Sequence, residues 1–240
     1  MPAVLGGFVE LLDTFGNDLT VVNAARVSFH KEVDTMSSGD EKLVKYLADH
    51  NHVTPFFHPQ ARFRIKMPIF VAREWYRHQI GFARNEVSRR YVDTEPEMYL
   101  PTCVRERDVK LKQGSKATEV PLNDQAYAII KETNELTSQA YRKLLLLNVA
   151  PEVARTILPQ GMYTEFIETG SLAAYSRLCA LRLDPSAQWE IRQYAAAVSS
   201  LMEEAFPVSW KALQPEGWKA PLETQKMPSG EAVQAAVNGC

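Results

Sequence analysis

The sequence lacks several features that would assign it to a familiar class. It has no apolar run of membrane-spanning length, no GxGxxG or P-loop fingerprint, and no excess of basic residues. Its 27 lysines and arginines face 29 acidic residues, so the net charge is −2. We therefore expect no membrane span, no Rossmann-type nucleotide site and no attraction of nucleic acid by overall charge. Any anion site must be built locally.

Cysteine is also scarce, with three residues and no CxxC pair. An odd count argues against a disulfide framework and favours a reducing compartment, so we expect a cytoplasmic protein. The first twelve residues have no basic flank and reach Glu10 quickly, unlike a signal peptide. Cys103, Cys179 and Cys240 have no histidine beside them in sequence, so we expect no thiol nucleophile.

The remaining composition is that of a globular protein, with 45% apolar and 23% charged residues over 240 positions. Helical patterns dominate, and a strand is clear only at 60–67, where polar and apolar residues alternate. The expected helices are 41–49 after an N-cap at Asp40, Pro68 toward His78, 122–148, one opening at Pro151 with Val153, Ala154 and Ile157 inside, 171–182, and one from Asp184-Pro185 to about Phe206. We predict one helix-rich α+β domain over residues 1–218, with a polar surface excursion at 93–123 and a loosely held tail at 219–240.

The segment from Arg77 to Tyr91 concentrates positive charge in this acidic protein. It reads Arg-His-Gln-Ile-Gly-Phe-Ala-Arg-Asn-Glu-Val-Ser-Arg-Arg-Tyr, and five of its fifteen residues are Arg or His. Like charges this close repel, and a bound anion relieves the repulsion. Guanidinium groups bind phosphate bidentately. The segment therefore predicts a phosphate-binding site.

Other interpretations of this segment remain open. It could be a solvated basic face with an internal ion pair to Glu86. It could also be the phosphate clamp of a nucleotide- or RNA-binding protein, or part of a structural helical oligomer. The interleaved Phe82, Val87 and Tyr91 favour a half-buried, rigid site. His50, His52 and His58 lack the carboxylate or cysteine partners and the HExxH spacing of a metal site, so we expect no metal.

The segment resembles the signature of the flavin-dependent thymidylate synthases, which is Arg-His-Arg, seven residues and Ser, within a longer Asn-Glu-x-Ser-x-Arg-Tyr ending. Arg77-His78 matches, and so does the stretch from Asn85 to Tyr91. There are two departures, because Gln79 replaces the second arginine and eight residues precede Ser88. We hypothesise that the guanidinium of Arg84 replaces the missing one.

The resemblance extends over roughly residues 20–210. Arg182 follows Arg155 by 27 residues, which is the spacing of two nucleotide-binding arginines in that family. The other similar stretches, in the same order as in the family, are Ala24–Ser28, His52–Phe56, Val153–Arg155 with Leu158-Pro159, and Gln188–Ile191.

The resemblance implies a fold, an activity and an assembly. The fold would be a helix-rich α+β domain with a small, mainly antiparallel sheet. The activity would be reductive methylation of dUMP to dTMP, with 5,10-methylene-tetrahydrofolate as carbon donor, FAD reduced by NADPH, and no protein nucleophile. The assembly would be a homotetramer with shared active sites, without nucleic acid or membrane partners.

The resemblance also implies roles for individual residues. Arg182 would be the catalytic residue, as a fixed cation beside the pyrimidine. Flavin contacts would come from Ser28, Thr54, Arg77, His78, Gln79, Arg84, Glu86, Ser171 and Arg177. Contacts to dUMP would come from Glu74, Arg77, Glu86, Ser88, Arg89, Arg90, Arg155 and Arg182.

Three of these residues have a plainer interpretation as well. Arg182 could simply pair with Asp184 on a helix surface, and His78 could be a satisfied structural histidine. An acid is unfavourable next to a phosphate, so we expect Glu74 to pair with an arginine or point away from the nucleotide.

Overall fold

The computed structural model describes residues 1–109 and 115–214. Its main sheet has five antiparallel strands in the order β1-β2-β3-β7-β4. These strands are β1 Ala3–Val4, β2 Gly7–Phe15, β3 Gln60–Pro68, β7 Tyr163–Ser171 and β4 Phe82–Glu86. A separate two-stranded hairpin is formed by β5 Arg105–Arg107 and β6 Ser115–Glu119.

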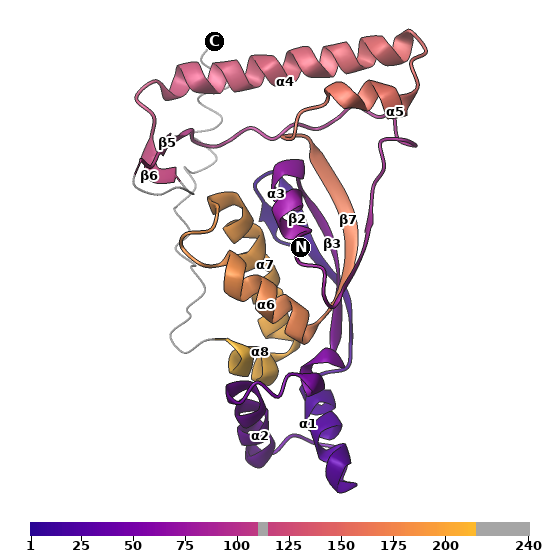
Figure 1. The fold of residues 1–240 in the computed structure, drawn as a ribbon, viewed down its shortest axis with the longest axis vertical. Coiled ribbons are helices and arrows are strands. Elements are labelled where there is room, and N and C mark those ends of the chain that lie inside the picture. The colour runs from indigo at the N-terminus through magenta and orange to yellow at the C-terminus, as the bar shows by residue number, and fades with distance from the viewer. Residues whose placement is uncertain (110–114, 215–240) are drawn as a thin grey trace.

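Helices cover one face of this sheet and extend beyond both of its ends. The α-helices are α1 Asp18–Arg26, α2 Ser38–Asp49, α3 Ile69–Trp75, α4 Asn123–Leu146, α5 Pro151–Ala154, α6 Leu172–Arg182, α7 Trp189–Ala205 and α8 Pro207–Leu213. Three short 3-10 helices are η1 Val27–Phe29, η2 Thr54–Phe57 and η3 Arg155–Ile157. Figure 1 shows α6 and α7 beside the sheet, α1 and α2 at its lower end, and α4 and α5 at its upper end.

Strand β3 shows why the sheet has a buried and an open face. Its side chains alternate in direction, as the sequence pattern predicted. The inward side chains, Ala61, Phe63, Ile65 and Met67, are fully buried beneath the helices. The outward ones form ion pairs across the open face, namely Arg62 with Asp13, Arg64 with Glu165 and Lys66 with Glu97. The strand predicted at 60–67 is confirmed and extends to Pro68.

The fold class predicted from the sequence is confirmed, since the described chain is helix-rich with antiparallel sheets. The predicted helices at 122–148 and 171–182 correspond to α4 and α6. No helix of the described residues is long and apolar enough to cross a membrane. The tail predicted at 219–240 lies outside the described residues.

Two predicted helix starts are wrong, each for a local reason. Helix α2 begins at Ser38, because Ser37 is its N-cap and Asp40 is the third residue of a capping box. Helix α7 begins at Trp189, because the Asp184 carboxylate accepts from the Ser186 backbone N–H at 2.8 Å and closes a turn instead.

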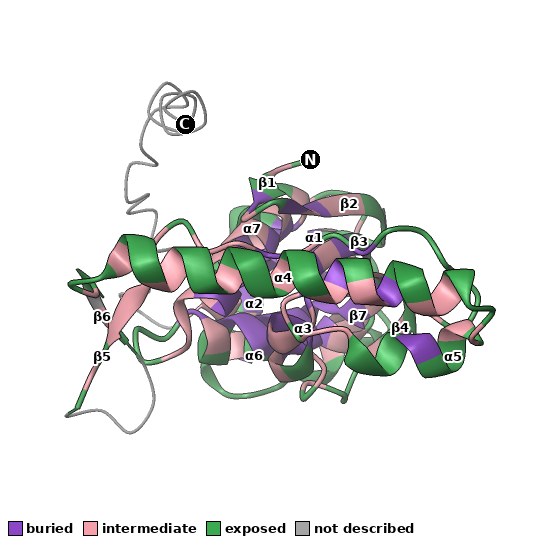
Figure 2. Cartoon of the chain, turned by 90° about the horizontal axis from the view of Figure 1, so that it is seen from above, coloured by how far each residue is buried: buried purple, intermediate pink, exposed green. Residues whose placement is uncertain are grey.

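The helix predicted from Pro151 is also shorter than expected. It ends at Ala154 and continues as η3. Ala154 is buried, whereas Val153 is 55% and Ile157 39% exposed, so the expectation that all three lie inside is wrong for the single chain. Helix α4 shares this exposure, because only Ser138 and Tyr141 of its residues are buried. Figure 2 shows α4 lying across the molecule with a largely exposed surface.

Candidate functional site

Arg182, the predicted catalytic residue, lies at the end of α6 against the end of α3. Its Nε donates to Nε2 of His78 at 2.9 Å, and its Nη2 donates to the backbone oxygen of Glu74 at 3.3 Å. Its Nη1 lies 3.9 Å from the Glu74 carboxylate. The expected pairing of Glu74 with an arginine is thus confirmed, and the Arg182 guanidinium is held in one orientation. Asp184 instead bonds to Ser186.

His78 is half-buried among several arginines. Burial is the largest cause that lowers the pKa of His78, followed by the charges of Arg182, Arg84, Arg177 and Arg77, and the pKa falls to about 4. The imidazole is therefore neutral at pH 7. Because Nε2 accepts from Arg182, the ring proton lies on Nδ1. A neutral histidine can orient Arg182 without adding another charge to the cluster.

The turn that follows α3 is anchored on the N-terminal half of α6. Arg177 donates to the backbone oxygen of Ile80 at 2.7 Å. Gly81 has φ +83°, and a Cβ there would lie 2.9 Å from the Cβ of Ala174, so only glycine fits. Ser171 is buried and caps α6 by accepting from the Ala174 N–H at 3.2 Å. Its side chain is thereby occupied by the helix, although the sequence placed it among the flavin contacts.

Arg84 lies on β4 directly opposite Glu168 of β7, and the two form an ion pair. Glu168 is fully buried, and only 14% of the Arg84 side chain is exposed. Trp75 Nε1 also donates to both carboxylate oxygens, at 3.1 and 3.2 Å. The Arg84 guanidinium already has a protein partner, so its predicted role as a flavin ligand stays a prediction that needs its own test.

Glu86 ends β4, two residues beyond Arg84. Its carboxylate accepts from the Thr164 hydroxyl at 2.5 Å. Burial, with the charges of Glu86 and Glu168, raises the pKa of Tyr76 well above its usual value, so this phenol stays protonated. The Tyr76 hydroxyl and Arg84 Nη2 are buried without a hydrogen-bond partner. Unsatisfied donors beside the turn are consistent with a site that receives ligand oxygens or water.

Residues 88–90 follow β4 and contact neighbouring residues of their own segment and α5. The Ser88 hydroxyl accepts from the Arg90 N–H at 3.3 Å, and Arg89 donates to the Thr94 backbone oxygen. Arg90 Nε lies 3.6 Å from the Glu152 carboxylate of α5. The neighbouring Arg155 is exposed on η3.

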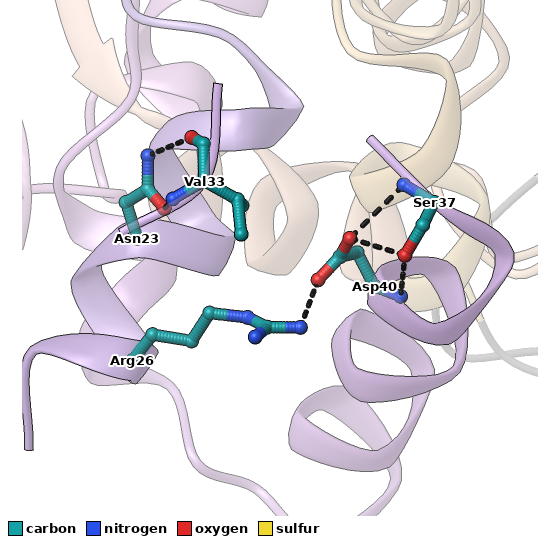
Figure 3. A network of polar contacts seen from close by, with 5 residues as sticks. All are labelled: Asn23, Arg26, Val33, Ser37 and Asp40. Carbon is teal, nitrogen blue, oxygen red and sulfur yellow. Dashed lines mark hydrogen bonds and ion pairs between the residues drawn. The ribbon is translucent and has the colours of Figure 1, made fainter. Parts of the chain in front are cut away.

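Ser28 comes from the end of the molecule away from α5, whereas Thr54 lies on η2, which contacts both α1 and α6. Both are exposed, on η1 and η2 respectively. Figure 3 shows how the segment carrying Ser28 is tied to α2, because Arg26 donates to the Asp40 carboxylate, which also accepts from the N–H and hydroxyl of Ser37. The hydrogen bonds from Ser37, and then Arg26, hold the pKa of Asp40 below its usual value.

The structure therefore brings together only some of the predicted site residues. Glu74, His78 and Arg182 meet directly, with Arg177 and Arg84 contributing to the same electrostatic environment. Helices α1 and α5, which η1 and η3 directly follow in sequence, lie at opposite ends of the molecule (Figure 1). One chain alone does not bring their Ser28 and Arg155 to the same place.

A groove on the open face of the sheet was not anticipated from the sequence. It has a volume of about 580 Å³ and runs between β3, β7 and the segment after β4. Its charged lining includes Arg64, Lys66, Arg89, Glu97 and Glu165. The alternation on β3 had shown that Arg64 and Lys66 share a face, but the strands that complete the groove were not predicted.

Metal binding and thiol chemistry are the other chemistries to consider for the described part of the chain. No group of three His, Cys, Asp or Glu residues there could hold a metal ion. Cys179 is fully buried, and burial raises the pKa of its thiol far above the usual value. Cys103 is a free, partly exposed thiol, and Cys240 lies outside the described residues.

Comparisons with known proteins agree on one family. A family model described as thymidylate synthase complementing protein matches residues 10–208. A flavin-dependent thymidylate synthase of Thermosipho melanesiensis is 42% identical over 207 residues, covering 86% of this chain and 90% of that protein. One from Thermus thermophilus is 39% identical over 214 residues, covering 89% and 78%.

A solved structure supports the same assignment. The UMP/dUMP methylase PolB from Streptomyces cacaoi, bound with 5-Br dUMP, superposes with a TM-score of 0.75 and 28% identity, covering 86% of this chain and 94% of that one. The family match includes the arginine-rich segment and both downstream arginines, so the resemblance seen in the sequence is confirmed. The chain belongs to the family of flavin-dependent thymidylate synthases.

Proposed function

We propose that this protein methylates dUMP to dTMP, with 5,10-methylene-tetrahydrofolate as carbon donor and FAD reduced by NADPH, in the cytoplasm. The observation that carries the proposal is the fixed guanidinium of Arg182, held by a neutral His78 and by Glu74. The curated relatives are flavin-dependent thymidylate synthases, and the solved relative is bound with a dUMP analogue.

The residues around Arg182 suit a nucleotide and a flavin. Arg77 and Arg155 are exposed and form no ion pair within residues 1–109 and 115–214, so both are available for phosphate. Tyr76, which precedes Arg77, and Arg84 also carry buried donors without a hydrogen-bond partner. Bound reduced flavin would supply the hydride, while the chain binds and orients both ligands.

Within this reaction Arg182 would act on the pyrimidine ring. A fixed cation beside a ring carbonyl stabilises the negative charge that develops as the ring reacts, and it needs no reorganisation at that moment. The flavin would be held by residues around the turn after α3 and by two residues of the 3-10 helices. These flavin residues are Arg77, His78, Gln79, Glu86, Arg177, Ser28 and Thr54, with Ser171 contributing through its cap of α6.

The dUMP phosphate and sugar would be held by Ser88, Arg89, Arg90 and Arg155. In the single chain this group lies toward α5, separate from Arg182. We infer that the site is completed by neighbouring subunits of a homotetramer. The exposed apolar surface of α4 and its C-cap supports this inference, since Leu136 is 69%, Leu146 87% and Leu147 75% exposed.

The reaction would proceed without a protein nucleophile. Cys179 is fully buried, and its thiol stays protonated because its pKa is raised. Cys103 belongs to the segment before β5 and has no histidine or cationic partner among the described contacts. The carbon acceptor would therefore be activated by flavin-derived hydride and by Arg182.

The first test is flavin uptake by the purified protein. We expect a yellow protein whose flavin absorbance bleaches with NADPH and returns in air. Tritium release from C5-labelled dUMP, with folate present, then measures the methylation. Arg182→Met should lower kcat by about 100-fold or more, because one electrostatic contact to the transition state is lost. Arg62→Met is the matched control, since its exposed pair with Asp13 lies on the open face.

Two outcomes would overturn the proposal. One is a colourless protein that takes up no FAD. The other is a flavin-loaded protein that releases no tritium from dUMP, and release that Arg182→Met leaves unchanged would overturn the role of Arg182.

A further inference from the structure

The position of strand β4 in the sheet sets where Glu86 and Ser88 of the proposed site lie. Strand β4 is an edge strand of five residues, and within residues 1–109 and 115–214 it pairs only with β7. A shift of its register by one residue would turn every side chain to the other face of the sheet. The chain has one residue more between Gln79 and Ser88 than the family signature, and β4 occupies most of this span. The register of β4 on β7 therefore sets the positions of Glu86, its last residue, and of Ser88 just beyond it.

The first contact that sets this register is between Phe82 and Gly170. The two residues are direct partners in the ladder. A Cβ at Gly170 would lie 2.5 Å from the Phe82 ring and 2.8 Å from the Tyr175 ring. Gly170 therefore leaves the space in which the Phe82 ring crosses β7 and packs edge-on against Tyr175, with ring centroids 4.9 Å apart.

The second contact is the ion pair of Arg84 with Glu168. Its carboxylate is fully buried, and Trp75 at the end of α3 donates to both oxygens. The guanidinium lies over the rings of Phe82 and Tyr76, at 4.6 and 5.5 Å from their centroids. A one-residue slip would carry Arg84 to the open face and leave Glu168 buried without a cation, which is strongly unfavourable.

The third contact is at the far end of the strand, where the Thr164 hydroxyl donates to Glu86 at 2.5 Å. Just beyond it, the Val87 N–H donates to the Glu165 backbone oxygen at 2.9 Å. Phe82, Arg84 and Glu86 all lie on the inner face of the sheet, on the side of α3 and α6. The three contacts thus agree on one register.

We propose that Arg84 and Glu168 are positioning residues that hold β4 in register and so place Glu86 and Ser88 for dUMP. Arg84 acts through Glu168 and does not bind the flavin. The proposal rests on the proposed function for the roles of Glu86 and Ser88.

The test is a cycle of four proteins, namely the wild type, Arg84→Met, Glu168→Met and the double variant. Each single variant leaves one buried charge unpaired, whereas the double variant replaces the pair with apolar side chains of similar length. Arg62→Met serves as the control for loss of an arginine from a cross-strand pair, because that pair is exposed.

Hydrogen exchange measures the register without reference to activity. The peptide that spans β4 and Val87 should exchange at least 10-fold faster in Arg84→Met and return to the wild-type rate in the double variant. Unchanged exchange in Arg84→Met would overturn the proposal. Should Arg84→Met fail to fold, Glu168→Met removes the same ion pair, and unchanged exchange of β4 in Glu168→Met would overturn the proposal.

Ligand titrations then separate positioning from direct flavin contact. We expect Arg84→Met to weaken dUMP binding by about 10-fold and the double variant to bind dUMP and FAD within about 3-fold of the wild type, because the cost of the unpaired charge is removed. A double variant that binds FAD as weakly as Arg84→Met would show that Arg84 is itself a ligand. A wild type that binds neither compound would refute the proposed function, while hydrogen exchange still tests the register.

Discussion

Replacing Arg182 by methionine should raise the pKa of His78. Burial lowers the pKa of His78 most and the Arg182 charge next, to about 4 against an ordinary value of 6.5. The substitution removes both that charge and the donor that bonds to Nε2. The burial remains, so the pKa should rise but stay below 6.5.

The same pKa has a consequence for stability. Between pH 6.5 and about 4, the unfolded chain binds a proton at His78 that the folded chain does not bind. The free energy of unfolding therefore falls as pH falls through this window, and His78 causes no further loss below it. The difference between the two pKa values corresponds to about 3 kcal/mol. Because the imidazole is half exposed, solvent screening leaves roughly half of that.

The measurement is a titration of the histidine ring nitrogens by NMR. The spectrum of His78→Gln assigns the signal, and Arg62→Met controls for the loss of a distant arginine. The titration also reports the tautomer, which should carry its proton on Nδ1 in the wild type. A wild-type His78 that titrates near pH 6.5, or a pKa that does not move in Arg182→Met, would refute the reasoning.

Three further predictions concern the scaffold and the assembly. Gly81→Ala should destabilise the protein by about 2 kcal/mol in thermal unfolding, because the φ of +83° and the contact with Ala174 exclude a Cβ. Gly39→Ala in α2 is its control and should be neutral or slightly stabilising. Trp75→Phe should cost about 1.5–3 kcal/mol in urea unfolding followed by circular dichroism, since a hydrogen bond to the buried Glu168 carboxylate is lost. Inactive Arg155→Met and Arg182→Met proteins should regain dUMP turnover when mixed under conditions of subunit exchange, and no recovery would argue against shared sites.

Sequence patterns predicted the parts of the fold that have simple periodicity. Strand β3 alternates polar and apolar residues without interruption, and α6 follows a serine that caps it. Strand β7 was missed because Glu165 and Glu168 place acidic side chains on both of its faces. No residue pattern distinguishes a fully buried glutamate from a solvated one when its partner is 84 positions away in sequence.

Contacts between residues far apart in sequence also explain why only part of the site was predicted. Arg182 and His78 stand out because their residue types and spacing match a known signature, and the structure joins them by a hydrogen bond. The sequence also pointed to Arg84 as a site residue, but it did not predict the ion pair with Glu168. Whether an arginine can bind a ligand depends on whether its guanidinium already has a partner in the protein. A guanidinium facing solvent can bind phosphate, whereas one that neutralises a buried carboxylate holds two strands in register. The substitution at Gln79 therefore need not be compensated by another cation at the same place. In the observed register the Arg84 guanidinium faces Glu168 across the sheet, while Arg77, Arg90 and Arg155 are exposed and accessible to phosphate.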